Sequence, residues 1–202
     1  KDDDLASNIA EIFKERLNII NEDVLNVDEN SLATEKITVF GNLPYNISTE
    51  ILSRWIINLK NDFWFDRLVL MFQKEVADRI IAKYNTSDYG RLSILANWKL
   101  EITKICDISP GSFFPRPKIT SSLICLKPKK NFYNFENSKN LEKITRVFFN
   151  HRRKMIKKPY NFLFNNNLEI KKKLKINLDL RPQNLDLDTY YKLVNEYENL
   201  RS

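Results

Sequence analysis

The chain has 202 residues, of which 43% are hydrophobic and 29% are charged, so it can bury a core and is unlike a disordered tail. Two cysteines and one histidine exclude a zinc finger or a disulfide scaffold, and three scattered glycines exclude a glycine-rich phosphate loop within this sequence. The net charge of +7 favours a polyanionic partner, and no apolar run reaches the length of a membrane span.

The first segment has apolar residues at helical spacing, which predicts a helix over Asp4–Arg16. The short apolar run Leu17–Ile20 predicts a strand that ends just before Asp23. If this strand lies beside the next one, the carboxylate of Asp23 points into the crevice at the strand ends. An exposed aspartate in a turn explains the same residue equally well.

A second strand is predicted over Lys36–Phe40, where it is closed by Gly41. A helix over Glu50–Leu59 follows, and Ser48 or Thr49 is placed to cap it. Strand, short connection and helix in this order are typical of an α/β unit.

The middle of the chain continues the alternation of strands and helices. Arg67–Phe72 is nearly continuously apolar, as is typical of a strand in the middle of a parallel sheet. Helices are predicted over Lys74–Ala82 and Arg91–Trp98, with a loop at Tyr84–Tyr89 between them. The pattern predicts a sheet built from crossover units.

Two further strands, Lys99–Cys106 and Ile119–Leu126, are separated only by the proline-containing loop Ser109–Lys118. A connection without a helix predicts an antiparallel edge added to the parallel sheet. Cys106 and Cys125 fall in alternating apolar runs, which predicts buried free thiols and a reducing compartment.

After Pro128 the sequence shows helical periodicity only, so we expect a domain over residues 1–128 and a small helical domain over residues 129–202. From Lys143 to Lys175 there are eleven basic residues and one acidic residue. This excess predicts a phosphate-binding surface, and the alternative is a solvated helix face.

The stretch from Asn42 to Ser48 reads Asn-Leu-Pro-Tyr-Asn-Ile-Ser and begins at the carboxyl end of a predicted parallel strand, where ligands bind in open α/β sheets. The amide oxygen of Asn42 and a backbone carbonyl can accept both N–H groups of an exocyclic amine, while Tyr45 stacks on its ring. The nitrogen lone pair is then free to attack an electrophilic methyl group. A simple turn at the strand end is the alternative.

A second aromatic residue, Phe113, lies in the loop between the last two strands. Its ring can close a sandwich over a flipped base, because an unstacked base needs replacement stacking worth about 1–3 kcal/mol. A hydrophobic plug under the loop is an equally good reading of an isolated phenylalanine.

Five sequence blocks follow one another along nearly the whole chain: NLPYNIS (42–48), FQKEVADRI (72–80), YGRLSI (89–94), SFFPRPKITSS (112–122) and FFNHRRKMIKK (148–158). Together they resemble the small-subunit ribosomal RNA adenine N6,N6-dimethyltransferases. Erythromycin-resistance RNA methyltransferases share the first and fourth kinds of block, whereas the third and fifth look like the ribosome-biogenesis branch.

The resemblance implies an α/β fold. Its Rossmann-like class I methyltransferase sheet would be incomplete at the N-terminus and carry an antiparallel edge strand, and a small all-α C-terminal domain would follow. It implies S-adenosylmethionine as methyl donor, no metal, and dimethylation of two adjacent adenosines in the 3′-terminal hairpin of small-subunit rRNA within the pre-30S particle. A cytoplasmic monomer that acts in ribosome biogenesis is expected.

The resemblance also assigns site residues. Asn42, Leu43, Pro44 and Tyr45 look like the catalytic motif, with Phe113 as the second stacking residue. Asp23 is similar to the acidic residue that bonds the adenine of the donor, and Asn42 to a position near the donor's methionine end. The expected RNA-facing residues are Arg116, Lys118, Arg152, Arg153, Lys154, Lys157 and Lys158.

One feature of the family is missing from this sequence: the first strand and the glycine-rich donor loop would precede Lys1. We therefore expect the chain to be part of a longer enzyme or a truncated paralogue. Two other functions stay open, a non-catalytic RNA-binding assembly factor and a resistance-type methyltransferase that acts on 23S rRNA.

Overall fold

The computed structural model describes residues 2–32, 34–60 and 62–201. The chain forms two compact units, Lys1–Glu35 and Lys36–Ser202, each with its own internal packing.

The first unit contains helix α1 (Asp3–Phe13), which begins where the Asp2 carboxylate accepts the backbone N–H of Leu5 at 2.9 Å. The predicted helix is confirmed, with its last turn drawn tighter as the 3-10 turn Lys14–Arg16. The predicted strand Leu17–Ile20 is wrong. A strand needs a neighbour to satisfy its backbone groups, and no described residue of this unit forms one.

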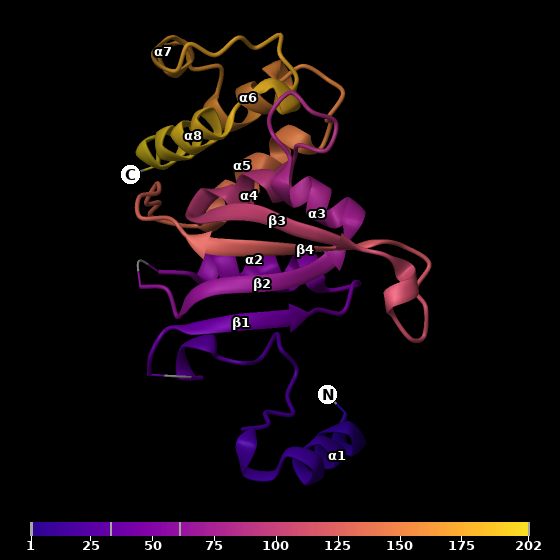
Figure 1. The fold of residues 1–202 in the computed structure, drawn as a ribbon. Coiled ribbons are helices and arrows are strands. Elements are labelled where there is room, and N and C mark those ends of the chain that lie inside the picture. The colour runs from indigo at the N-terminus through magenta and orange to yellow at the C-terminus, as the bar shows by residue number, and fades with distance from the viewer. Residues whose placement is uncertain (1, 33, 61, 202) are drawn as a thin grey trace. The chain divides into compact units, whose positions relative to one another are not determined.

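The second unit is built on a four-stranded sheet in the order β1-β2-β4-β3 (Figure 1). Its strands are β1 (Ile37–Asn42), β2 (Phe65–Gln73), β3 (Leu100–Ile108) and β4 (Ser121–Pro128). β1 and β2 are parallel, and β4 runs antiparallel to both of its neighbours, as the short connection predicted. β4 itself lies inside the sheet, because the chain passes through two helices to form β3 at the edge before β4 fills the place beside β2.

β2 is the central apolar strand of the sheet. Its residues Leu68–Phe72 are all buried, which confirms the prediction made from their continuous apolar run. Burial of each such side chain stabilises the fold by about 1.5–3 kcal/mol.

Three helices accompany the sheet: α2 (Ser48–Asn58), α3 (Lys74–Ile81) and α4 (Arg91–Lys99). Each was predicted to within two residues at either end. α3 and α4 contact the strands directly, and α2 packs against α4. In Figure 1 α2 lies behind the sheet. Its amino end stays close to the end of β1, because only a short loop joins Asn42 to Ser48.

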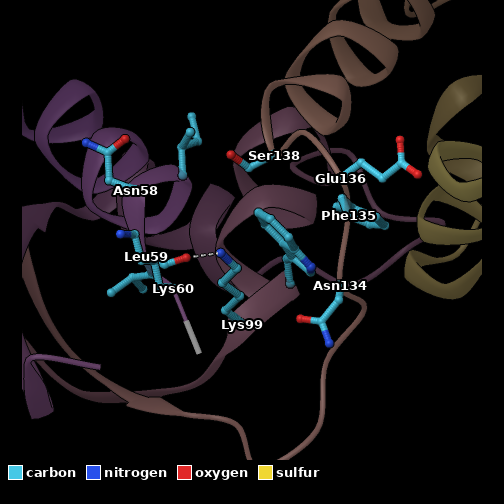
Figure 2. A pocket seen from close by; sticks show the side chains of 10 residues that line it. Asn58, Leu59, Lys60, Lys99, Asn134, Phe135, Glu136 and Ser138 are labelled. Carbon is cyan, nitrogen blue, oxygen red and sulfur yellow. Dashed lines mark hydrogen bonds between the residues drawn. The ribbon is translucent and has the colours of Figure 1, made fainter. Parts of the chain in front are cut away.

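A lysine from α4 holds the far end of α2. Lys99 is only 4% exposed, and its Nζ donates hydrogen bonds to the carbonyl oxygens of Ile56, at 3.4 Å, and Leu59. Figure 2 shows this amine beside the Leu59 carbonyl at the wall of a cavity of about 480 Å³. The ammonium also lies 4.0 Å from the ring centre of Trp98. A positive charge at a helix carboxyl end is favourable, because the last carbonyls there lack partners within the helix.

The segment after Pro128 forms α5 (Lys139–Phe149), α6 (Lys157–Phe164), α7 (Leu168–Lys173) and α8 (Leu187–Asn199). α5 and α8 contact each other and α4, so these helices belong to the same compact unit as the sheet. The domain boundary at Pro128 stays a prediction. Among the described residues, no helix combines the length and the apolar character needed to cross a bilayer.

Both cysteines are free, as predicted, but the prediction that both are buried is wrong: Cys106 is exposed and Cys125 half-buried. The pairing of β3 with β4 shifts register between Lys104 and Cys106, which breaks the strict alternation of faces. Ile105 and Cys106 are therefore both exposed.

Candidate functional site

The loops that follow β1 and β3 leave the sheet on the same side, at the carboxyl ends of these two strands (Figure 1). β1 and β2 are parallel, and β3 points the same way as β2 because both oppose β4. Gln73 at the end of β2 and Ile108 at the end of β3 each pair with Ser121. The structure thus brings the Asn42 motif and the Phe113 loop to the same edge of the sheet.

The loop Asn42–Ile47 is anchored by a buried leucine and a backbone hydrogen bond, while Asn42 stays exposed. Leu43 is buried, and the carbonyl of Pro44 accepts the N–H of Ile47 at 3.1 Å, which closes the turn into α2. Asn42 is exposed, and its amide has no hydrogen-bond partner among the described residues. A carbonyl oxygen has two lone pairs, so that of Pro44 can still accept a second donor.

Tyr45 is fixed by a residue from a distant part of the chain. Its hydroxyl lies 2.6 Å from Oγ of the buried Ser121, which is 76 positions away. The phenol oxygen is therefore held while the ring stays half-exposed. Sequence reasoning missed Ser121, because no local pattern links it to the motif.

The predicted capping of α2 by Ser48 or Thr49 is wrong. Ile47 occupies the position before the first helical residue, and no side chain caps the helix there. The buried Ser48 instead donates its hydroxyl to the carbonyl of Tyr45 at 3.2 Å. This bond ties the loop Asn42–Tyr45 to the first turn of the helix.

Gly41 allows β1 to approach β2 closely just before the motif. A Cβ atom at this position would lie 2.7 Å from Cδ2 of Leu70, a completely buried side chain. Any larger residue would therefore require the Leu70 side chain or the strand that carries Asn42 to shift.

The loop after β3 presents two aromatic rings of different exposure. Phe113 is half-buried, whereas Phe114 is fully exposed to solvent. The role of Phe113 as the second stacking residue stays a prediction, and the geometry makes Phe114 an additional ring at the same edge. Arg116 and Lys118 are both exposed in this loop.

A network of fixed charges supports this edge. Lys104 Nζ lies 2.6 Å from Asp107 and 3.6 Å from Asp78, and Asp78 also pairs with Lys74. Hydrogen bonds from Lys104 and then Ser122 lower the pKa of Asp107, and the bond to Asp78 raises the pKa of Lys74. These ion pairs join β3 to α3 just before the loop begins. Across the described residues, no three metal-binding side chains come together.

Asp23 belongs to the first unit, where it is exposed. One carboxylate oxygen, Oδ1, accepts the N–H of Leu25 at 2.9 Å, and its carbonyl accepts the N–H of Asn26 at 2.7 Å. The turn holds the carboxylate in place and leaves the second oxygen, Oδ2, available as an acceptor. Its contact with the donor stays a prediction.

The predicted RNA-facing residues of the helical segment divide into two groups. Arg153, Lys154, Lys157 and Lys158 are exposed. The half-buried Arg152 points its guanidinium into the protein. It donates to the side chain of Gln183 at 3.3 Å, to the carbonyl of Tyr89 at 2.9 Å and to the carbonyl of Ser87. These bonds hold the loop before α4, and the contact of Arg152 with RNA stays a prediction.

Comparison with known proteins points to one family. The model of "Ribosomal RNA adenine dimethylase" matches residues 1–199. The chain is 61% identical, over 201 residues, to a protein of Pelagibacter ubique named "Ribosomal RNA small subunit methyltransferase A", covering 100% of this chain and 77% of that protein. A protein of the same name from a Wolbachia of Drosophila simulans is 39% identical, covering 99% of this chain and 74% of that protein.

Two solved structures share the fold. A dimethyladenosine transferase from Plasmodium falciparum superposes with a TM-score of 0.82 at 24% identity, over 98% of this chain and 80% of that chain. The 23S rRNA methyltransferase ErmE gives a TM-score of 0.66 at 17% identity, over 100% of this chain and 80% of that chain. Both likenesses concern the fold of the chain.

Proposed function

The chain belongs to the ribosomal RNA adenine dimethylase family, and we propose that it transfers methyl groups from S-adenosylmethionine to N6 of two adjacent adenosines in the 3′-terminal hairpin of small-subunit rRNA. As an rRNA adenine dimethyltransferase it acts in ribosome biogenesis. We further propose that it works in the cytoplasm as a monomer on the pre-30S particle.

The proposal that the adenine base binds at the end of β1 rests on the arrangement of Asn42 and Tyr45. The free amide oxygen of Asn42 and the backbone carbonyl of Pro44 accept the two N–H groups of the adenine amine. Tyr45, anchored through Ser121, stacks on the base, and Phe113 covers the other side. With both N–H groups held, the nitrogen can become tetrahedral, so that its lone pair lies out of the ring plane and is free to attack the methyl group. A new N–C bond would replace the bond from methyl to sulfur, and the amine would then lose a proton.

The proposal of S-adenosylmethionine as donor is supported in each unit taken by itself. Asp23 of the first unit keeps a carboxylate oxygen that can accept from an amino group, and Asn42 of the second unit is exposed at the end of β1. When bound, the donor supplies a methyl group on a positively charged sulfur. The chain's own contribution is to position the amine, and no group with a pKa near neutrality is needed for it.

The substrate RNA is held by exposed cations. Arg116 and Lys118 lie in the loop beside the reacting site, and Arg153, Lys154, Lys157 and Lys158 in the helical segment. Neutralisation of phosphates by such side chains provides most of the affinity for RNA and makes it depend on salt.

The test is methyl transfer to small-subunit particles that lack these methyl groups, with N6,N6-dimethyladenosine quantified by mass spectrometry. Tyr45→Ala is expected to lose about ten- to hundredfold in turnover, the worth of one base–aromatic stack, while RNA binding survives. Tyr45→Phe and Ser121→Ala each remove only the 2.6 Å contact, so both are expected to have small effects, and their double variant no more than either alone.

Normal turnover in Tyr45→Ala would exclude the stacking role. Faster methylation of 23S rRNA than of the particles would favour a resistance-type enzyme. Particle binding by the wild type without any transfer would favour an assembly factor.

A further inference from the structure

An exposed aromatic ring lies at the wall of a cavity between α5 and α6. Phe162 is 72% exposed, although its neighbours Leu163 and Phe164 on α6 are buried. The cavity has a volume of about 450 Å³ and is also lined by Lys158 of α6 and by His151, just after α5. This volume falls in the range of small-molecule pockets.

A second cavity, of about 550 Å³, adjoins the first. The two share His151, Lys158 and Pro159 as lining residues, and we call them together the groove. Met155, 57% exposed, adds a second apolar surface. The other cations of the groove are Arg146, Arg153, Lys154, Lys157 and Arg181.

The cations of this groove are not neutralised by the protein. Neither cavity has a carboxylate in its lining. In the described part of the chain, no acidic residue forms an ion pair with any of them. By contrast, Lys173 of α7 pairs with Glu196 at 2.6 Å. An accessible run of unpaired cations favours a ligand with several negative charges.

We propose that this groove binds unpaired nucleotides of the rRNA substrate, with one base stacked on Phe162 and the flanking phosphates on Lys158 and its basic neighbours. The inference rests on the proposed function and deepens it, because it adds a base-stacking contact at Phe162 to the phosphate contacts already proposed for the helical segment. An aromatic ring beside cations is the arrangement that binds single-stranded RNA, because every unpaired base offers a flat face and every nucleotide a phosphate. A duplex hides those faces, and the carboxylates of an acidic peptide pair with the cations without any contact to Phe162.

The first experiment compares two fluorescein-labelled oligomers by anisotropy: single-stranded hexa-adenylate and a hexamer of the same ribose phosphates without bases. Phe162→Leu keeps an apolar side chain but removes the flat ring. It is expected to weaken hexa-adenylate binding about tenfold, and to leave binding of the baseless hexamer unchanged. Phe162→Trp is expected to restore the affinity. The matched control is Tyr84→Leu, which removes a 51% exposed aromatic ring outside both cavities and is expected to change neither affinity.

The second experiment reads the site directly. In Phe162→Trp, the fluorescence added by the new indole is expected to be quenched by hexa-adenylate and not by the baseless hexamer or by poly-glutamate. Quenching of equal size by poly-glutamate, or equal loss of both hexamers in Phe162→Leu, would overturn the proposal.

Methyl transfer to the small-subunit particle, measured in parallel, separates this inference from the proposed function. If the wild type transfers methyl groups and Phe162→Leu binds hexa-adenylate as well as the wild type does, RNA binding in the groove is excluded. The proposed methylation is then unaffected. Absence of transfer in the wild type, with a tenfold loss of binding in Phe162→Leu, would remove the methylation and leave an RNA-binding groove.

Discussion

Tyr45 takes its position from a residue that no local pattern connects to it. The motif Asn42–Tyr45 is visible in the sequence, because asparagine, proline and tyrosine after a strand are a recognisable combination. The hydroxyl contact with Ser121 depends on β4 lying beside β2, which is a property of the folded sheet. The same holds for Lys99, whose burial against α2 the sequence does not reveal.

Lys99 leads to a prediction for the dependence of stability on pH. Burial lowers its pKa from the ordinary 10.5 to about 8. Between these values the unfolded chain binds a proton that the folded chain does not, so this group makes stability rise with pH by at most about 1.4 kcal/mol per pH unit. Below about pH 8 Lys99 is charged in the folded chain as well, so burial of this charge lowers the free energy of unfolding by its full amount.

The measurement is the free energy of unfolding in urea between pH 8 and 9.5, for wild type and Lys99→Met. The difference between the two curves is expected to change with pH in the direction that favours the wild type. Lys83→Met, at an exposed lysine, is the control and is expected to run parallel to the wild type. Parallel curves for Lys99→Met would contradict the prediction.

At the scale of elements, strands with a strong local signal were predicted well and those that depend on a neighbour were not. Leu68–Phe72 is apolar throughout and becomes the central strand. Leu17–Ile20 is also apolar, but within the described part of its unit no strand pairs with it. The shift in register near Cys106 likewise arises from pairing with β4 and exposes a thiol that alternation placed inside.

Two adjacent arginines, Arg152 and Arg153, are predicted to differ in what they contribute to stability and to RNA binding. Arg152 bonds the loop at Ser87 and Tyr89, whereas Arg153 is exposed. Arg152→Met is expected to lower the free energy of unfolding by about 2 kcal/mol, because it leaves acceptors for a charged donor unsatisfied. Arg153→Met is expected to change stability by less than about 0.5 kcal/mol and to weaken RNA binding.

Urea unfolding and filter binding of small-subunit rRNA measure the two properties on the same protein preparations. A stability loss in Arg153→Met equal to that in Arg152→Met would show that the two side chains are not divided between structure and RNA.

On the scale of the whole molecule, the charge of +7 is concentrated where the helices after Pro128 meet solvent. Aromatic side chains of the segment after Pro128 contact α4. Trp98 stacks on Phe135 at 4.8 Å between ring centres, and the hydroxyl of Tyr191 donates to the carbonyl of Ile94 at 2.9 Å. The basic helical segment is thus packed directly against α4, which itself contacts the sheet.

This distribution predicts the salt dependence of RNA binding. Each phosphate contact with single-stranded RNA contributes about 0.7 to the slope of log affinity against log salt. Replacing Arg153 and Lys154 by glutamine is expected to reduce the slope by about 1.4. Lys173→Gln is the control, because its ammonium is already paired with Glu196. An unchanged slope in the double variant would exclude phosphate contacts at Arg153 and Lys154.

The sequence by itself determined the order of strands and helices from β1 to β4, the motif Asn42–Tyr45, the basic character of the helical segment and the family resemblance. These depend on neighbours in the chain, whose spacing and chemistry can be read directly. Only the tertiary structure decided the inner position of β4, the anchoring of Tyr45 by Ser121, the inward direction of Arg152 and the exposure of Phe162. Each of these arises from contacts between residues far apart in sequence, and such contacts are set by how the elements pack against one another.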